Sequence, residues 1–308
     1  MRIVFMGTPE FAAVSLRALI GAGHEVTGVF TQPDRPAGRG GRLKQSAVKE
    51  LALTAGIKVF QPGRSREGAD ALRALRPELI AVVAYGQILP PEILALPPGG
   101  CVNLHASLLP LYRGAAPIQW ALLNGETETG VTTMRMDAGM DTGDILLQES
   151  CPILPGEDMG ALHDKLAFLG AALLAETLRR LESGGLTARP QSEGATCAPR
   201  LGRSDERLPW PEDAVSLARR VRALRPWPGA FTQLRGETIK VWEAEVRPEE
   251  GPGQAGPGEI LRLGESGILC AAGCGALELL TVQPAGRKSM VAADFARGRR
   301  LGPGERFL

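Results

Sequence analysis

Short apolar runs alternate with amphipathic segments along the first hundred residues. The apolar runs predict strands over residues 3–5, 25–30, 58–60 and 79–84. The segments between them predict helices over residues 11–20, 46–55 and 68–75. Strands that alternate with helices are typical of an α/β protein with a doubly wound, mostly parallel sheet. The run at 79–84 is apolar throughout, as expected of a parallel strand that is buried on both faces.

The middle of the chain continues this pattern and then loses it. We expect strands over residues 102–105, 130–136 and 145–151, and helices over residues 117–123 and 158–183. Residues 187–208 then show no strong periodicity and contain Pro190, Gly194, Pro199 and Gly202. We interpret this stretch as a linker.

The last hundred residues predict a different architecture. After a helix at 212–224, the pattern predicts strands over residues 231–234, 238–246, 259–263, 268–272 and 276–282. Short strands separated by glycine-containing turns are typical of a small all-β barrel, and we expect an OB-like one. The sequence therefore predicts an α/β domain over residues 1–188, a linker over 189–205 and a barrel domain over 206–308.

Composition limits the class of protein. The 308 residues are 44% hydrophobic and 22% charged, which is enough apolar material for one large or two ordinary globular domains. The net charge of +1 argues against a chain that binds polyanions over its whole surface. Any nucleic-acid site must therefore be local.

Cysteine usage and the N-terminal sequence indicate a cytoplasmic protein without a membrane span. The five cysteines are an odd number without paired spacing, which favours free thiols in a reducing compartment. Gly7 interrupts the N-terminal apolar run too early for a signal peptide, and no run approaches the roughly 20 apolar residues of a membrane span. Cys270 and Cys274 lack further ligands, and no G-x-G-x-x-G motif follows the first strand. We therefore expect neither a metal nor a nucleotide cofactor.

Two residues of the strand at 102–105 are candidates for catalysis. Residues i and i+2 of a strand point to the same face, so Asn103 and His105 would project side by side with Leu104 packed behind them. An amide donor beside an imidazole suits a carbonyl that becomes a tetrahedral oxyanion. Asp141 could hold the imidazole in one tautomer and favour its charged form. The alternative is that Asn103 and His105 are buried polar residues whose hydrogen bonds only stabilise the fold.

Residues 32–44 are rich in glycine and proline and carry an excess of cations. The cations are Arg35, Arg39, Arg42 and Lys44. One interpretation is a solvated surface loop. The other is an adaptable basic loop that binds phosphates or the end of a nucleic acid, for which the forked guanidinium groups are suited.

A further candidate binding segment follows the buried strand at 79–84. Open α/β sheets bind ligands beyond the carboxyl ends of their strands. Tyr85 and Gly86 stand there, and Ile88 and Leu89 offer apolar walls. The alternative is an ordinary loop that begins a helix.

Eight sequence blocks occur together in this chain. In the first domain they are Phe5-x-Gly7-Thr8-Pro9-x-Phe11, Thr31-Gln32-Pro33-Asp34-Arg35-Pro36-Ala37-Gly38-Arg39-Gly40, Val83-Ala84-Tyr85-Gly86, Asn103-x-His105-x-Ser107-Leu108-Leu109-Pro110, Arg113-Gly114-Ala115-Ala116-Pro117-Ile118-Gln119 and Met136-Asp137-x-Gly139-x-Asp141-Thr142-Gly143-Asp144. In the second domain they are Pro226-Trp227-Pro228 and Gln283-Pro284-Ala285-Gly286. Together they resemble the methionyl-tRNA formyltransferase family over nearly the whole chain. Trp120 departs from the family pattern, where a polar or basic residue is expected.

The resemblance implies a Rossmann-like formyltransferase domain and an activity in translation initiation. The implied donor is 10-formyltetrahydrofolate, and the implied acceptor is the α-amine of methionine esterified to initiator tRNA. Asn103, His105 and Asp141 match the catalytic trio. The folate-binding candidates are Tyr85, Gly86, Ile88, Leu89, Ser107, Leu108, Leu109, Pro110 and Asp137. The tRNA-binding candidates are Arg35, Arg39, Arg42 and Lys44, together with the second domain, and we expect a monomer.

The resemblance also gives the trio definite roles. The neutral amine attacks the formyl carbon while Asn103 and protonated His105 stabilise the oxyanion. Asp141 supports the imidazolium and helps to move protons from the amine to N10 of the folate. Because a free α-amine has a pKa near about 7.7–8.0 and its ester a lower one, no strong base is required.

Three rival functions are compatible with parts of this pattern. A formyltransferase for an amino sugar nucleotide could share the first domain and the trio, but the basic loop and the second domain favour tRNA. A noncatalytic folate- or RNA-binding regulator would not need all three catalytic residues. A formyl-folate hydrolase is the weakest alternative, because we expect no further domain.

Overall fold

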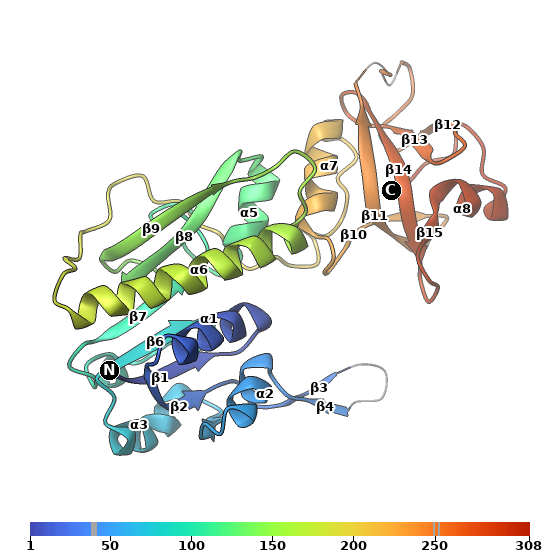
Figure 1. The fold of residues 1–308 in the computed structure, drawn as a ribbon. Coiled ribbons are helices and arrows are strands. Elements are labelled where there is room, and N and C mark those ends of the chain that lie inside the picture. Colours follow the sequence, from blue (N-terminus) through green and yellow to red (C-terminus); the bar gives the residue numbers. More distant parts are fainter. Residues whose placement is uncertain (38–41, 249, 252) are drawn as a thin grey trace. The chain divides into compact units, whose positions relative to one another are not determined.

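The computed structural model describes residues 1–37, 42–248, 250–251 and 253–308. The chain divides into two compact units, and Figure 1 shows their secondary structure. The first unit comprises Met1–Pro117, Glu128–Pro152 and His163–Pro199. The second comprises Ile118–Thr127, Ile153–Leu162 and Arg200–Leu308. Two short segments from the middle of the chain, including most of α5 (Pro117–Asn124), therefore belong with the C-terminal part.

The first unit is built on one seven-stranded sheet with the strand order β5-β2-β1-β6-β7-β8-β9. The bounds are β1 (Arg2–Gly7), β2 (Glu25–Phe30), β5 (Val59–Phe60), β6 (Leu79–Val83), β7 (Cys101–His105), β8 (Glu128–Arg135) and β9 (Ile145–Pro152). The pairs from β5 to β7 are parallel, and β8 and β9 are antiparallel to their neighbours. The predicted mostly parallel α/β sheet is confirmed.

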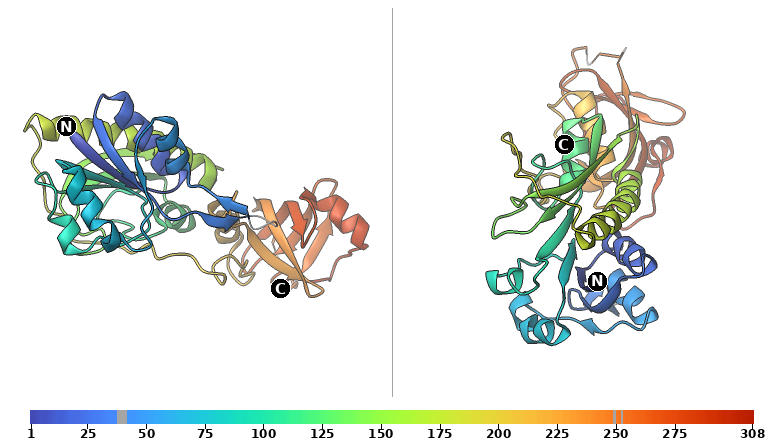
Figure 2. Two further views of the ribbon diagram at one scale, coloured as in Figure 1. Left: turned by 90° about the horizontal axis from the view of Figure 1, so that it is seen from below. Right: turned by 60° about the vertical axis from the view of Figure 1, so that its left-hand side comes forward.

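Helices cover both faces of this sheet. They are α1 (Glu10–Gly21), α2 (Ala47–Thr54), α3 (Ala69–Leu75) after the 3-10 turn η1 (Ser65–Gly68), α4 (Pro91–Leu94) and α6 (Met159–Glu182). Phe11 of α1 meets His163 of α6 edge to face, so these two helices share one side of the sheet. Leu72 of α3 and Ile93 of α4 are buried together with Val82 of β6. Figure 2 shows α1 and α6 on one side and α3 on the other.

The two faces of β7 have different surroundings. Leu104 lies against α6 at Gly170, whose added Cβ would come within 2.8 Å of the leucine side chain. Cys101 points to the opposite side, where its thiol lies 3.9 Å from the carbonyl oxygen of Ile93 in α4. Since side chains alternate along a strand, Asn103 and His105 share the face of Cys101. The burial of Leu104 under α6 thus sets the direction of both polar side chains.

The C-terminal part of the second unit contains an antiparallel sheet together with helices α7 and α8. The sheet order is β10-β11-β14-β13-β12, and β15 pairs with β14. The bounds are α7 (Ala214–Ala223), β10 (Ala230–Leu234), β11 (Glu237–Arg247), β12 (Ile260–Leu263), β13 (Ile268–Ala271), β14 (Ala276–Pro284), β15 (Met290–Val291) and α8 (Ala292–Arg299). The predicted C-terminal β domain is confirmed, but helix α8 was not predicted from the sequence.

The last residues of the chain join the two ends of this sheet. Leu308 and Gln233 of β10 exchange two backbone hydrogen bonds, and Phe307 donates to the carbonyl oxygen of Gly258 just before β12. The amide of Ile260 donates to the carbonyl oxygen of Glu305. The C-terminal segment therefore lies between the first and last strands of the path, as in a small closed barrel. None of the helices in the described part of the chain is long and apolar enough to cross a membrane.

Candidate active site

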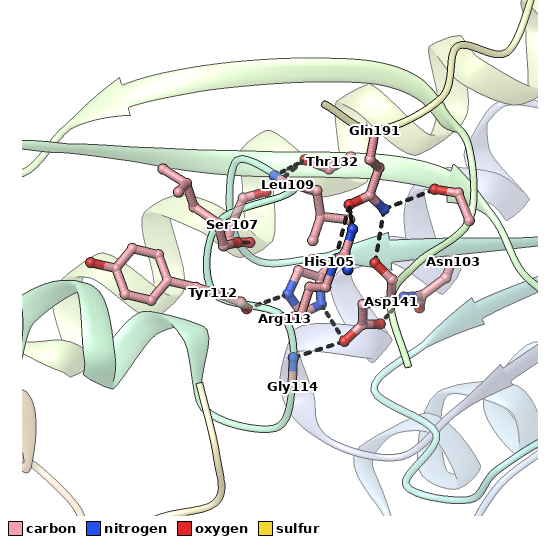
Figure 3. Close-up of polar contacts among 12 residues, drawn as sticks. Asn103, His105, Ser107, Leu109, Tyr112, Arg113, Gly114, Thr132, Asp141 and Gln191 are labelled. Atoms are coloured by element: carbon pink, nitrogen blue, oxygen red, sulfur yellow. Dashed lines mark hydrogen bonds and ion pairs between the residues drawn. The ribbon is translucent and has the colours of Figure 1, made fainter. Parts of the chain in front are cut away.

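Strand β7 presents Asn103 and His105 on one face, as the alternation predicts (Figure 3). Both side chains are nearly buried, with 9% and 6% of their surface exposed. Asn103 is paired with Val82 of β6 on one side and Met134 of β8 on the other. The two polar groups therefore sit on a rigid strand inside the sheet, which is where a precise geometry is easiest to maintain.

Asp141 reaches these residues from the loop between β8 and β9. Its Oδ1 lies 3.5 Å from Nδ2 of Asn103, and its Oδ2 lies 3.7 Å from Nδ1 of His105. Oδ2 also accepts a 2.9 Å hydrogen bond from the amide of Gly114. The carboxylate side chain is 16% exposed. The structure thus brings together the three residues that the sequence analysis grouped as catalytic.

The partners of His105 constrain its protonation. Nε2 lies 2.9 Å from the carbonyl oxygen of Tyr112, and a carbonyl can only accept, so Nε2 carries a hydrogen. A neutral ring would then turn the lone pair of Nδ1 toward the carboxylate of Asp141, which is unfavourable. A doubly protonated ring instead donates to the carbonyl oxygen of Tyr112 and lies at ion-pair distance, 3.7 Å, from the carboxylate of Asp141. The site therefore suits an imidazolium that stabilises negative charge.

The backbone of the Asp141 loop is unusual. Asp141 has a φ of +54°, in the left-handed region, which costs a residue with a Cβ on the order of 1 kcal/mol or more. A Cβ on Gly143 would lie 1.7 Å from the carbonyl oxygen of Arg135, so only glycine fits there. Asp137 accepts hydrogen bonds from the amide of Gly139 and the hydroxyl of Thr142. This loop is therefore held in one conformation by its own residues.

Gln191 holds the same loop from outside and is itself held by Arg113, and neither residue was predicted from the sequence to have this role. Nε2 of Gln191 donates 2.8 Å hydrogen bonds to the carbonyl oxygens of both Asp141 and Gly143. Oε1 of Gln191 accepts from Nε and Nη2 of Arg113 at 3.1 and 2.7 Å. Gln191 stands in the stretch interpreted as a linker, where no periodicity pointed to a structural role, whereas Arg113 was noted only as part of a sequence block.

The linker stretch is anchored to the first unit up to Pro199. The hydroxyl of Thr196 accepts from the amide of Tyr112, and the amide of Ala198 donates to the carbonyl oxygen of Arg113. Arg189 exchanges two backbone hydrogen bonds with Ile145 of β9. These backbone contacts fix the segment beside the candidate catalytic residues.

Eight of the nine folate-binding candidates lie on two loops at the carboxyl ends of the neighbouring strands β6 and β7. Ile88 is 84% exposed beside the buried Leu89 and offers apolar surface to solvent. The Tyr85 side chain is buried, and burial raises its pKa to about 12. The hydroxyl of Ser107 donates to the carbonyl oxygen of Leu111. Tyr85 and Ser107 thus contribute to the packing of these loops, and a ligand would meet mainly the backbone and Ile88.

The remaining folate-binding candidates have mixed environments. Leu109 is buried, and its amide donates to the hydroxyl of Thr132. Leu108 and Pro110 are half-buried, whereas Gly86 is exposed and has a φ of +81°. Asp137 is exposed and lies in the Asp141 loop described above.

The basic segment forms a short hairpin at its base. Strands β3 (Arg35–Ala37) and β4 (Arg42–Lys44) pair antiparallel, so the stretch interpreted as a loop contains regular structure at these positions. Arg35 and Lys44 are exposed partners across the hairpin, whereas Arg39 lies outside the described residues. Lys49 donates to Asp34 at 2.6 Å, and this hydrogen bond lowers the pKa of the Asp34 carboxyl. The base of the hairpin is therefore fixed to α2.

Within the part of the chain that the structure describes, no cluster of three or more His, Cys, Asp or Glu side chains could hold a metal ion.

Comparison with known proteins gives a consistent assignment for both units. Residues 1–178 match the model of the formyl transferase family, and residues 200–300 match that of the formyl transferase C-terminal domain. A methionyl-tRNA formyltransferase of Geobacter sulfurreducens is 50% identical over 310 residues, covering 100% of this chain and 96% of the relative. One from Symbiobacterium thermophilum is 52% identical over 311 residues, covering 100% and 95%.

A solved structure shares the fold at lower identity. The sugar 3N-formyl transferase WlaRD, crystallised in the presence of dTDP and 5-N-formyl-THF, superposes with a TM-score of 0.69 at 17% identity. The match covers 94% of this chain and 99% of that one.

Proposed function

Since the chain belongs to the methionyl-tRNA formyltransferase family, we propose that Asn103, His105 and Asp141 carry out its reaction. The enzyme transfers a formyl group to the amine of methionyl-tRNA for translation initiation. The single observation that supports this assignment is the convergence of an amide, an imidazole and a carboxylate within 3.5–3.7 Å from two separate segments. This constellation matches the requirements of acyl transfer to an amine.

The donor in this proposal is 10-formyltetrahydrofolate. The neutral amine attacks the formyl carbon, and the carbonyl oxygen becomes an oxyanion. Nδ2 of Asn103 and the protonated ring of His105 donate hydrogen bonds to that oxygen. The bond between the formyl carbon and N10 then breaks, and N10 receives a proton in place of the one that the amine loses. Asp141 keeps His105 charged and oriented and accepts protons in transit through water.

The folate is proposed to lie over the loops that follow β6 and β7. The exposed Ile88 provides an apolar contact for the pteridine or the aryl ring. Backbone groups of Gly86 and Leu108 supply hydrogen bonds, because the side chains of Tyr85 and Ser107 are turned into the fold and the amide of Leu109 already donates to Thr132. The WlaRD structure, whose crystals contained a formyl folate, supports a folate site in this fold.

The tRNA is proposed to contact the basic hairpin and the second unit. Arg35 and Lys44 stand exposed on β3 and β4, and the hairpin is anchored at Asp34. Cationic groups on a fixed base suit the phosphates of an acceptor stem. We assign formyl transfer to residues 1–188, the connection to 189–205 and tRNA binding to 206–308, in a cytoplasmic monomer.

The experiment that tests the proposal mixes the protein with 10-formyltetrahydrofolate and charged initiator methionyl-tRNA. Formation of N-formylmethionyl-tRNA, with loss of turnover in Asp141→Asn and His105→Ala, is the expected result. An exposed variant in the first unit that leaves the trio and the hairpin intact, Arg73→Ala on α3, controls for nonspecific loss. Formylation of an amino sugar nucleotide, with none of methionyl-tRNA, would refute the acceptor assignment.

A further inference from the structure

The loop that carries the carboxylate of Asp141 is held in place by Gln191, a residue of the stretch 189–205 that was interpreted as a linker. The backbone of Asp141 lies in the left-handed region, which a residue with a Cβ adopts only if its surroundings enforce the conformation. Two peptide groups of the loop, at Asp141 and Gly143, turn their carbonyl oxygens toward the same external donor, Nε2 of Gln191. We propose that Gln191 is a positioning residue of the formyl-transfer site that acts through Asp141.

The chemistry of the partners fixes the orientation of the Gln191 amide. Its nitrogen faces two carbonyl oxygens, which can only accept, and its oxygen faces the guanidinium of Arg113, which can only donate. Exchanging the oxygen and the nitrogen would break all of these contacts. The side chain is therefore a bridge with a defined direction, from Arg113 through the amide to the Asp141 loop (Figure 3).

Neighbouring contacts tie the same segment to the other side of the site. The hydroxyl of Thr196 holds the amide of Tyr112, whose carbonyl oxygen receives Nε2 of His105. The next residue but one, Gly114, donates its amide to Oδ2 of Asp141. The segment from Gln191 to Thr196 thus contacts the backbone that supports both Asp141 and His105, although it supplies no group that meets the reacting atoms.

This inference rests on the proposed role of Asp141, and its consequence is a change in turnover rather than in substrate binding. Loss of the bridge lets the carboxylate move relative to His105 and Asn103. A displacement of about 1 Å at a catalytic group can cost about 10²-fold in rate. We therefore expect Gln191→Ala to lower kcat by about 10²-fold and to leave both KM values within about threefold of the wild-type values.

A second variant separates the two ends of the bridge. Gln191→Glu keeps the length of the side chain and can still accept from Arg113, but a carboxylate cannot donate to the two carbonyl oxygens. The loss in kcat should be at least as large as in Gln191→Ala. Wild-type turnover in Gln191→Glu would show that pairing with Arg113 alone matters and would overturn the proposal. Ser192→Ala, at the exposed neighbouring position, is the matched control and should retain wild-type turnover.

A double-mutant cycle provides the decisive test. Single-turnover formylation of methionyl-tRNA is measured for wild type, Gln191→Ala, Asp141→Asn and the double variant. If Gln191 acts through Asp141, adding Gln191→Ala to Asp141→Asn should cost less than about threefold, whereas independent effects would multiply. Multiplying effects, or a loss below about threefold in Gln191→Ala alone, would refute the inference.

Two further outcomes are informative. Full activity of Asp141→Asn would refute the role of Asp141 and this inference with it, whereas absence of wild-type formylation would refute the function itself. A lowered melting temperature of Gln191→Ala does not affect the double-mutant cycle, because only folded variants are compared. The concentration of active sites is measured by titration with folate and made equal for all variants.

Discussion

Replacement of Asn103 tests the oxyanion assignment most directly. Asn103→Ala removes a nearly buried amide from β7 and leaves the side chains of His105 and Asp141 themselves unchanged. In the folded enzyme this amide makes only a weak contact, because Nδ2 lies 3.5 Å from Oδ1 of Asp141. Its contribution to folding should therefore be about 1 kcal/mol or less. In the transition state, however, it would donate to a full oxyanion.

The expected loss in turnover is much larger than the loss in stability. Removal of one oxyanion donor costs about 2.7–4 kcal/mol, which corresponds to about 10²–10³ in kcat. Asn103→Asp should be worse still, because it puts a carboxylate about 3.5 Å from that of Asp141. At an effective dielectric constant of about 20, that repulsion amounts to about 5 kcal/mol. Turnover should therefore decrease in the order wild type, Asn103→Ala, Asn103→Asp.

The assay is formylation of methionyl-tRNA under saturating folate, with unfolding by urea measured in parallel. We expect kcat to fall by about 10²–10³ in Asn103→Ala while the free energy of unfolding changes by about 1 kcal/mol or less. A loss in kcat of less than tenfold in a folded protein would contradict the role of Asn103. An equal loss of stability and turnover would support the alternative that this amide only stabilises the fold.

Three further predictions concern other parts of the chain. Neutralising the cations of the hairpin should make the slope of log K for tRNA binding against log salt concentration shallower by about 2–3, since each phosphate contact contributes about 0.9. An unchanged slope would exclude the hairpin as a phosphate-binding site. The residues to replace by glutamine are Arg35, Arg42 and Lys44. Gly143→Ala forces a Cβ against the carbonyl oxygen of Arg135 and should lower kcat by about 10²-fold, whereas Gly298→Ala, in open space on α8, should leave it unchanged. Asp213 is the N-cap of α7, and the hydrogen bond from the hydroxyl of Ser216 is the main cause of the lowered pKa of its carboxyl. The ionised carboxylate therefore stabilises the fold above the unfolded pKa of about 3.9. This stabilisation is lost as the pH falls through the lower pKa of the folded state. Urea unfolding should therefore show Asp213→Ala destabilised by about 1 kcal/mol at pH 7, with a difference that shrinks in acid; a constant difference would contradict the cap.

Helix α8 shows how a signal in the sequence can be overlooked. Its N-cap, Val291, makes no side-chain capping bond, and Gly298 interrupts its last turn. The buried residues Ala292, Phe295 and Ala296 nevertheless have the i, i+3, i+4 spacing of a helix face. The stretch is short and follows a series of strands, and its helical conformation depends on packing these three residues against the sheet.

The alternation of Val102, Asn103, Leu104 and His105 was sufficient to predict the direction of both candidate catalytic side chains. The reason is that successive side chains of a strand point to opposite faces of the sheet. Once the apolar residues are buried on one face, the polar residues between them must point to the other face. The order of strands and helices in the first unit could be predicted for the same reason. These properties depend on neighbours within a few residues of one another.

Only the tertiary structure decided where Asp141 stands and what holds it. Asp141 lies 38 positions from Asn103, and Gln191 lies 50 positions from Asp141. The backbone contacts that join the C-terminal residues to β10 and Gly258 are likewise unreadable along the chain, because any residue can supply a backbone amide or carbonyl. The periodicity of the sequence thus determined which side chains each helix or strand exposes on which face. Long-range hydrogen bonds determined which loops meet at the site, and these bonds leave no periodic pattern in the sequence.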